Sequence, residues 1–404
     1  MIDIKNIFKR YSEYIIPFSD PLIKDIIDYY FYESFINCKL IQIARNTYCQ
    51  YHPTTDIFDT LTDYTLDLLR TDDSLLIYFD TEATSQYFPI YECLHHNCKI
   101  YNINPSRILY IGANIFENEL YEDFVQLNHI EDKINVLAYP MYDLVSLCTY
   151  HRLRFNDIVN LKNNEELLFN KSIKKFRHEY QDKFFSSLSR RNRFDRTMGL
   201  YCMSSYLSID RCLISHAQLS TEELEGYLNC LIENKCKYLI DDFVKWTTTL
   251  PLSVDNISDN KILYSFTPLV HYQSLFHIAS ESVQNDLYKK SMYFTEKTCK
   301  PILNFQPFIV LGQEGCHKIL EDRGFKLFYD LFDYSFDQET NLKNRYDMLF
   351  NMLKDVSIRL EKLTRDEQIQ LRVNQAHILK HNFIQLHNLE NFKHTLFEVF
   401  KFRR

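Results

Sequence analysis

A strand–helix–strand pattern in the last third of the chain constrains the fold more than any other feature. The apolar run Leu275–Ala279 predicts a buried strand whose carboxyl end presents Glu281. Thr295 is a suitable N-cap for a helix over Glu296–Asn304, and Phe308–Leu311 predicts a second buried strand. Because strands that alternate with helices form parallel sheets, the pattern predicts an α/β domain that binds ligands at the carboxyl ends of its strands.

Similar elements are predicted along most of the chain. Further strands are predicted over Ser74–Phe79, Arg107–Ile111, Asn135–Tyr139, Lys183–Leu188 and Phe325–Tyr329. Residues 1–70 are predicted to be mostly helical. Further helices are predicted over Pro89–Asn97, Leu120–Leu127, Phe194–Tyr206 and Cys316–Asp322, and an amphipathic helix over Tyr346–Leu363. Two more helices are predicted to begin at capping boxes, at Ser220 and at Thr364.

These elements predict two α/β domains and a helical carboxyl terminus. The first domain is predicted over residues 1–178 and the second over residues 179–340, with the basic stretch Lys171–Tyr180 as the linker between them. Residues 341–404 are predicted to form helices that pack across the domains.

The predicted helix start at Thr295 carries chemistry suited to a phosphate group. A helix N-terminus offers free N–H groups and about half a positive charge. Lys297 adds a full charge, and Lys300 lies one turn on. Glu296 beside it, and Glu281 at the preceding strand end, are acceptors suited to the hydroxyls of a ribose or a sugar. The alternative is that Glu296 and Lys297 form an ordinary first turn.

A second candidate anion site follows the predicted strand Lys183–Leu188. The loop and helix start after this strand contain four arginines, namely Arg190, Arg191, Arg193 and Arg196. Arginine binds a diphosphate in bidentate fashion, whereas lysine acts as a point charge. We interpret these arginines as phosphate ligands; the alternative is a loop whose charge serves solubility.

Two carboxylates follow the strand predicted over Ser74–Phe79. Asp80 and Glu82 lie at its carboxyl end, on the expected cleft side. A carboxylate in that place is a candidate general base that takes a proton from an acceptor hydroxyl. The alternative is a loop with two solvated acids.

The sequence around the first pattern resembles the donor-site motif of α-1,3-fucosyltransferases. The residues that carry this resemblance are Glu281, Ser282, Tyr293–Lys297, Pro307 and Gly312. A closer resemblance is to glycosyltransferase-like proteins encoded by tailed phages, which share the Thr-Glu-Lys run, the segment Gly324–Lys326 and an arginine-rich loop. The chain departs from the fucosyltransferase motif at Phe305 and Gln306, which replace a small residue and glycine, so the sugar is not implied.

The resemblance implies a GT-B fold and glycosyl transfer. In that fold, two Rossmann-like domains face each other across a cleft; the second binds the nucleotide sugar and the first presents the acceptor. A UDP- or GDP-linked sugar is then a co-substrate, no further cofactor is expected, and positive groups rather than a metal stabilise the leaving diphosphate. The expected site residues are Glu82 or Asp80 as the base, and Arg190, Arg191, Arg193, Arg196, Glu281, Ser282, Thr295, Glu296, Lys297 and Lys300 for the nucleotide sugar.

The predicted acceptor follows from the phage likeness and from the distribution of charge. The net charge is −8, yet Lys171–Arg196 holds nine basic and three acidic residues, and Asn341–Arg404 holds twelve basic and seven acidic residues. Such zones can hold a polyanion. We therefore predict 5-hydroxymethylpyrimidines in phage double-stranded DNA as the acceptor. The alternatives are a polysaccharide, a protein or a small-metabolite acceptor, or a catalytically inactive sugar-binding or virion-associated relative.

Composition indicates the compartment and the state of the thiols. The chain has neither a run of about 18 apolar residues nor a signal-peptide pattern at its start, so we expect a cytoplasmic protein, in the host cytoplasm if it is phage-encoded, without a membrane partner. Its 11 cysteines are irregularly spaced and expected to be reduced. The cluster Cys93–Cys98 fits no common zinc spacing, and no metal site is predicted.

Overall fold

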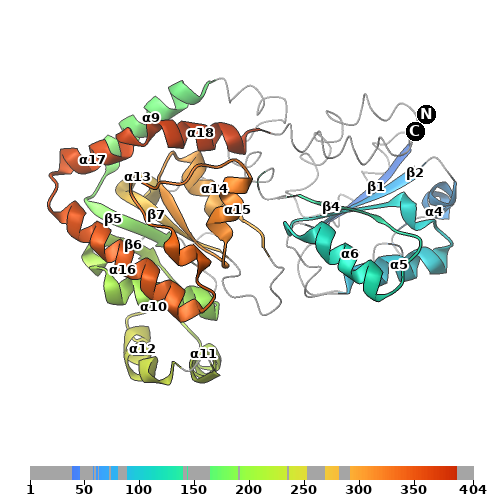
Figure 1. Cartoon of the computed structure of the whole chain (residues 1–404), viewed down its shortest axis with the longest axis horizontal. Coiled ribbons are helices and arrows are strands. Elements are labelled where there is room, and N and C mark those ends of the chain that lie inside the picture. Colours follow the sequence, from blue (N-terminus) through green and yellow to red (C-terminus); the bar gives the residue numbers. More distant parts are fainter. Residues whose placement is uncertain are drawn as a thin grey trace. The chain divides into compact units, whose positions relative to one another are not determined.

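The computed structural model describes residues 39–45, 58, 61, 63–71, 74–80, 89–139, 143, 164–189, 192–233, 236–252, 269–281 and 292–388. Contacts divide the chain into two units (Figure 1). Unit 1 comprises Met1–Asn160, Tyr288–Tyr293 and Asn388–Arg404, and unit 2 comprises Leu161–Leu287 and Phe294–His387. Each unit holds a four-stranded parallel sheet, which confirms the predicted α/β fold class.

Unit 1 is built on parallel strands in sequential order, β1-β2-β3-β4. The strands are β1 (Lys39–Arg45), β2 (Ser74–Asp80), β3 (Ile108–Gly112) and β4 (Asn135–Ala138). The described helices between them are α4 (Asp63–Arg70), α5 (Ile90–Tyr101) and α6 (Glu117–Leu127). Because alternate residues of a strand share a face, Leu76 and Tyr78 of β2 pack with Tyr110 of β3 and with these helices in one core.

Unit 2 has the strand order β6-β5-β7-β8, again with all strands parallel. The strands are β5 (Lys183–Leu188), β6 (Cys212–Ser215), β7 (Ser274–Ser280) and β8 (Phe308–Leu311). β7 and β8 are buried along their full lengths, as expected for parallel strands that are covered on both faces. Because β6 and β7 lie on opposite sides of β5, the carboxyl ends of β5 and β7 form a topological switch point.

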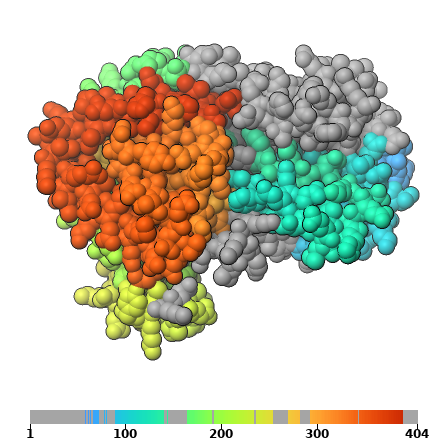
Figure 2. Space-filling view, viewed as in Figure 1, coloured from blue at the N-terminus to red at the C-terminus, as the bar shows by residue number. Residues whose placement is uncertain are grey.

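Helices surround the sheet of unit 2. They are α9 (Glu165–Glu179), α10 (Phe194–Tyr206), α11 (Thr221–Glu233), α12 (Ile240–Thr247), α13 (Val270–Gln273), α14 (Glu296–Leu303), α15 (Cys316–Asp322), α16 (Leu342–Glu361), α17 (Arg365–Asn374) and α18 (Ala376–Leu386). α10 contacts α16, whereas α14 contacts β7 and α18. α11 and α12 project from the rest of unit 2, as the space-filling view in Figure 2 shows.

Most predicted elements are confirmed. The helices α10 and α15 and the strands β5 and β8 have the predicted bounds. Both capping boxes are present: the Ser220 N–H donates to Glu223 Oε2 (2.8 Å) and the Glu223 N–H donates to Ser220 Oγ (3.1 Å), with the equivalent pair at Thr364 and Glu367. The residues within an element and at its ends are therefore enough to predict these helices and strands.

The strand predicted over Phe325–Tyr329 is wrong. α15 ends just before Gly324, which has a φ of 86°, and the following segment is irregular. The Lys326 N–H donates to Asn382 Oδ1 of α18 (2.7 Å), and Asn382 Nδ2 donates back to the Lys326 carbonyl (2.8 Å). A side chain thus satisfies the main-chain groups that a neighbouring strand would otherwise have bonded.

One prediction in the first half is also wrong. The basic stretch Lys171–Tyr180 is not a linker, because its residues through Glu179 are the second half of α9, where Ile173 and Phe176 are buried and the basic side chains project outward. Within residues 1–70, Lys39–Arg45 forms strand β1 and Asp63–Arg70 forms helix α4; most of the other residues lie outside the described ones, so the mostly helical content stays a prediction.

The carboxyl-terminal helices belong to unit 2. α16 buries the predicted apolar stripe, including Leu349, Leu353 and Leu360. Unit 2 begins at Leu161 by its contacts, ahead of the boundary predicted at residue 179. Among the described residues, the structure contains no helix with the length and apolar character needed to span a membrane.

Two buried histidines make unit 2 sensitive to acid. The rings of His271 and His277 lie 4.7 Å apart. Burial, together with the charges of Lys300 and Arg372, lowers the pKa of His271 to about 3, and burial lowers the pKa of His277 well below its usual value. In the unfolded chain these two histidines take up protons near pH 6.5, whereas in the folded chain they stay neutral. The free energy of unfolding is therefore highest above that pH and falls as the pH is lowered.

We expect the free energy of unfolding to fall by about 2 kcal/mol per buried histidine between pH 7 and pH 5. Urea denaturation followed by circular dichroism measures it. The change should be the same in a His178→Gln variant, because His178 is largely exposed. An unfolding free energy that is equal at the two pH values contradicts the prediction.

Candidate functional site

The switch point of unit 2 brings the start of α10 next to the end of β7. Arg193 is exposed and directly precedes α10, and Arg196 lies in the first turn with only 3% of its surface exposed. The Arg196 Nε–H donates to the main-chain carbonyl of Glu281, the residue after β7 (3.0 Å). Of the four predicted arginines, Arg196 is therefore placed beside the end of β7, and Arg193 lies at the start of α10.

Four of the predicted site residues lie outside the described residues. They are Glu82, Arg190, Arg191 and Ser282. Their assignments stay predictions.

The carboxylate of Glu281 is buried and fixes the start of α14. Its Oε1 accepts hydrogen bonds from the Thr295 N–H (3.0 Å) and the Thr298 hydroxyl (2.6 Å), and its Oε2 accepts one from the Thr295 hydroxyl (2.6 Å). Only 2% of Glu281 is exposed. These three donors give Glu281 a positioning role, and its direct contact with a ligand stays a prediction.

The first turn of α14 pairs its own charges. Thr295 is the N-cap, as predicted, and Lys297 Nζ donates to Thr295 Oγ1 (3.0 Å) and to Glu296 Oε1 (3.1 Å). Burial favours a raised pKa for Glu296, but the charges of Lys297 and Lys300, with hydrogen bonds, outweigh it and lower the pKa to about 2. Glu296 is thus ionised at neutral pH, and an anion that binds here competes with it for Lys297.

His216 holds the start of α10 from the side of β6. Its Nδ1–H donates to the Ala217 carbonyl (2.7 Å), which leaves Nε2 to accept from the Thr197 hydroxyl (3.1 Å). Burial lowers the pKa of His216, which favours this neutral form. Sequence reasoning missed His216 and also Thr298, although Thr298 lies three residues after the N-cap and so shares its side of the helix.

In unit 1, Asp80 is fully buried at the end of β2. Its Oδ2 accepts a hydrogen bond from the Tyr110 hydroxyl (2.8 Å). Nearby, the Tyr91 hydroxyl donates to the buried carboxylate of Glu117, and Gly112 leaves the room for that carboxylate, which a Cβ would strike. Asp80 therefore orients Tyr110 in this structure, and its assignment as a base stays a prediction.

Cys316, His317 and Asp337 form a buried cluster of ligand types. His317 Nε2 accepts from the Val310 N–H (3.1 Å), so Nδ1 carries the proton and donates to Asp337 Oδ1 (2.7 Å). A metal-bound histidine normally donates with its second nitrogen, whereas this one accepts. The cluster is therefore a hydrogen-bond network that ties β8 to α15.

Comparison with known proteins gives structural likeness only. No protein-family model matches the chain, and no curated protein matches it. The N-terminal domain of trehalose-6-phosphate phosphatase from Candida albicans is similar at 9% identity, covering 98% of this chain and 82% of that one, with a TM-score of 0.44. An α,α-trehalose-phosphate synthase (UDP-forming) from Burkholderia vietnamiensis is similar at 9% identity, covering 97% of this chain and 83% of that one, with a TM-score of 0.39. Because both TM-scores are low, the α/β class rests on the two parallel sheets.

Replacing Glu281 by glutamine tests its role at the start of α14. The amide keeps the shape but turns one acceptor into a donor that faces the Thr295 and Thr298 donors. We expect a loss of about 2 kcal/mol in the free energy of unfolding, the size of a charge-assisted hydrogen bond. Urea denaturation measures it. Glu314→Gln is the control, because Glu314 is exposed, and equal losses in the two variants would refute the assignment.

Proposed function

We propose that this chain is a glycosyltransferase that moves a sugar from a UDP- or GDP-linked donor to a hydroxyl acceptor. The observation that supports it is the grouping at the switch point of unit 2. There Arg196 bonds the end of β7, Arg193 precedes α10, and the α14 start carries Lys297. Parallel sheets bind ligands at such points, and helix starts with cations suit a diphosphate. The Glu281 and Thr295–Lys297 motif supports the same choice.

The proposed reaction is a single displacement. The acceptor oxygen forms a bond to the anomeric carbon of the sugar while the bond from that carbon to the diphosphate oxygen breaks, and the acceptor proton passes to a carboxylate. Lys297, Lys300 and the arginines stabilise the charge that grows on the leaving diphosphate, without a metal. We place the base at Glu82 rather than at Asp80, because Asp80 is fully buried.

Single substitutions at the switch point test the donor site. Lys297→Ala and Arg193→Ala should each weaken binding of UDP or GDP by about 1.5 to 3 kcal/mol, the usual range for a charge-assisted hydrogen bond. Calorimetric titration of the full chain measures the affinity. Lys354→Ala is the matched control, because Lys354 is exposed on α16. Unchanged affinity in both site variants would remove the donor site from the proposal.

We further propose that the acceptor is a 5-hydroxymethylpyrimidine in duplex DNA. Its hydroxyl projects into the major groove, so transfer is feasible in place or after base flipping. The carboxyl-terminal basic zone offers fewer phosphate contacts than its charge suggests, because Arg345 and Arg372 are buried and Lys343 and Lys380 form ion pairs. Contacts are therefore expected mainly from the basic side chains of α9 and from the arginine loop.

Mass spectrometry tests the acceptor. DNA that contains hydroxymethylcytosine or hydroxymethyluracil is incubated with the protein and a panel of UDP- and GDP-sugars, and its nucleosides are analysed. We expect a pentose or hexose mass on the modified base. Because duplex binding must involve several phosphates, log affinity should fall steeply and linearly with log salt, with a slope of about 0.9 per phosphate contact.

The other outcomes of this assay separate the alternatives. Release of sugar to water while every DNA stays unmodified would point to a polysaccharide, protein or metabolite acceptor. Neither release nor transfer with any donor, while UDP or GDP still binds, would point to a catalytically inactive sugar-binding relative.

A further inference from the structure

A pocket of about 370 Å³ lies in unit 2 where α10 meets α16 and the short helix η5 (Lys237–Leu239). Its size falls within the range of about 300 to 1,000 Å³ that is usual for small-molecule sites. Arg193, Arg196, Glu281 and Lys297 are not among the residues that line it. None of these four donor-site residues therefore contributes to the pocket, although Phe194, which lines it, directly follows Arg193.

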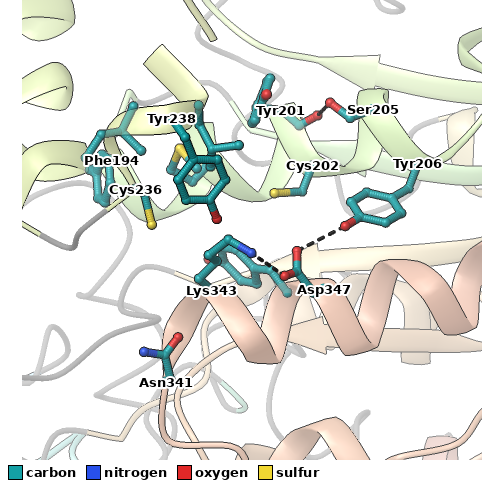
Figure 3. A pocket seen from close by; sticks show the side chains of 14 residues that line it. Phe194, Tyr201, Cys202, Ser205, Tyr206, Cys236, Tyr238, Asn341, Lys343 and Asp347 are labelled. Carbon is teal, nitrogen blue, oxygen red and sulfur yellow. Dashed lines mark hydrogen bonds and ion pairs between the residues drawn. The ribbon is translucent and has the colours of Figure 1, made fainter. Parts of the chain in front are cut away.

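Five of the fourteen lining residues are aromatic. Phe194 and Tyr201 of α10, Tyr238 of η5 and Tyr346 of α16 contribute rings, with Tyr206 at the far end of α10 (Figure 3). Tyr238 is 64% exposed, so much of its ring is open to a ligand. Aromatic faces of this kind bind flat rings by stacking.

The charged residues of the lining neutralise each other. Lys343 forms an ion pair with Asp347, and the Tyr206 hydroxyl donates to Asp347 Oδ1 (3.0 Å), as the dashed lines in Figure 3 show. Lys343 Nζ also lies 5.6 Å from the ring centroid of Tyr238. A ligand here thus meets a hydrogen-bond donor, Lys343, and an acceptor, Asp347, beside the ring of Tyr238. The pair has no net charge that would attract a phosphate.

The thiols of the pocket are unsuited to covalent chemistry. Cys202 and Cys236 both line it. Burial raises the pKa of Cys202 to about 12 and also raises the pKa of Cys236. Because the thiolate rather than the thiol is the nucleophile, these side chains serve as apolar lining, and the ligand binds without a covalent bond.

We propose that this pocket binds a nucleoside, with its base stacked on Tyr238 and its polar edge hydrogen-bonded by Lys343 and Asp347. A base supplies the flat ring and the donors and acceptors that the lining matches, and a ribose fills further volume. A phosphorylated nucleotide brings charge that the ion pair does not offset, and a free sugar lacks the flat ring. The proposal does not depend on glycosyl transfer.

Calorimetric titration of the full chain with adenosine, guanosine, uridine and cytidine tests the site, with methyl glucoside as the non-aromatic comparison. We expect at least one nucleoside to bind saturably and methyl glucoside not to bind. Tyr238→Ala should weaken that binding about tenfold, the loss expected for one stacked ring. Tyr238→Phe should bind within about twofold of the natural chain, because it keeps the ring.

Two control variants separate this site from others. Tyr329→Ala should bind as the natural chain does, because Tyr329 is 60% exposed and does not line the pocket. Lys297→Ala should also keep nucleoside affinity. Nucleoside binding that is lost in Lys297→Ala and kept in Tyr238→Ala would place the base at the donor site and overturn the proposal. Absence of saturable binding by all four nucleosides, or equal affinity for methyl glucoside, would overturn it as well.

Discussion

The candidate site depends on hydrogen bonds that hold helix α14 at both of its ends. This helix has eight residues and contains Pro301, which has no N–H to donate. A helix of this length is not stable by itself. At its start Glu281 accepts three hydrogen bonds, and at its end the Arg372 guanidinium donates to the carbonyls of Asn304 (2.8 Å) and Phe305 (2.9 Å). Tertiary contacts rather than helix propensity therefore place the Thr-Glu-Lys turn at the switch point.

The buried guanidinium of Arg372 is tolerated because its donors meet main-chain carbonyls. Besides the end of α14, it bonds the carbonyl of His271 (2.9 Å), and it lies 4.2 Å from the ring centroid of Phe176. Burial lowers the pKa of Arg372 to about 9, so the group is still charged at neutral pH. Its charge in turn helps to keep His271 neutral. Arg372 thus helps to position α14 and adds to the effect of burial on the pKa of His271.

The sequence predicts elements whose signals are local and misses those that depend on distant partners. Phe308–Leu311 is an apolar run between a proline and a glycine, and it forms the predicted strand. Phe325–Tyr329 looked similar, but Asn382 of α18, far along the chain, bonds its main chain instead. At the site, Thr295 was recognisable as an N-cap, whereas the three donors around Glu281 come together only once β7 and α14 are packed.

The pairing of charges at the α14 start has a consequence for the proposed chemistry. Without ligand, Lys297 is neutralised by Glu296, so the fold does not have to hold an unpaired cation in a largely buried place. A diphosphate that takes over Lys297 frees the Glu296 carboxylate from that ion pair, while the charge of Lys300 still favours its ionised form. The released carboxylate is then an acceptor-only group next to the phosphate, where a ribose or sugar hydroxyl of the same donor needs one. One exchange would thus bind the charged part of a nucleotide sugar and free the group that recognises its hydroxyls.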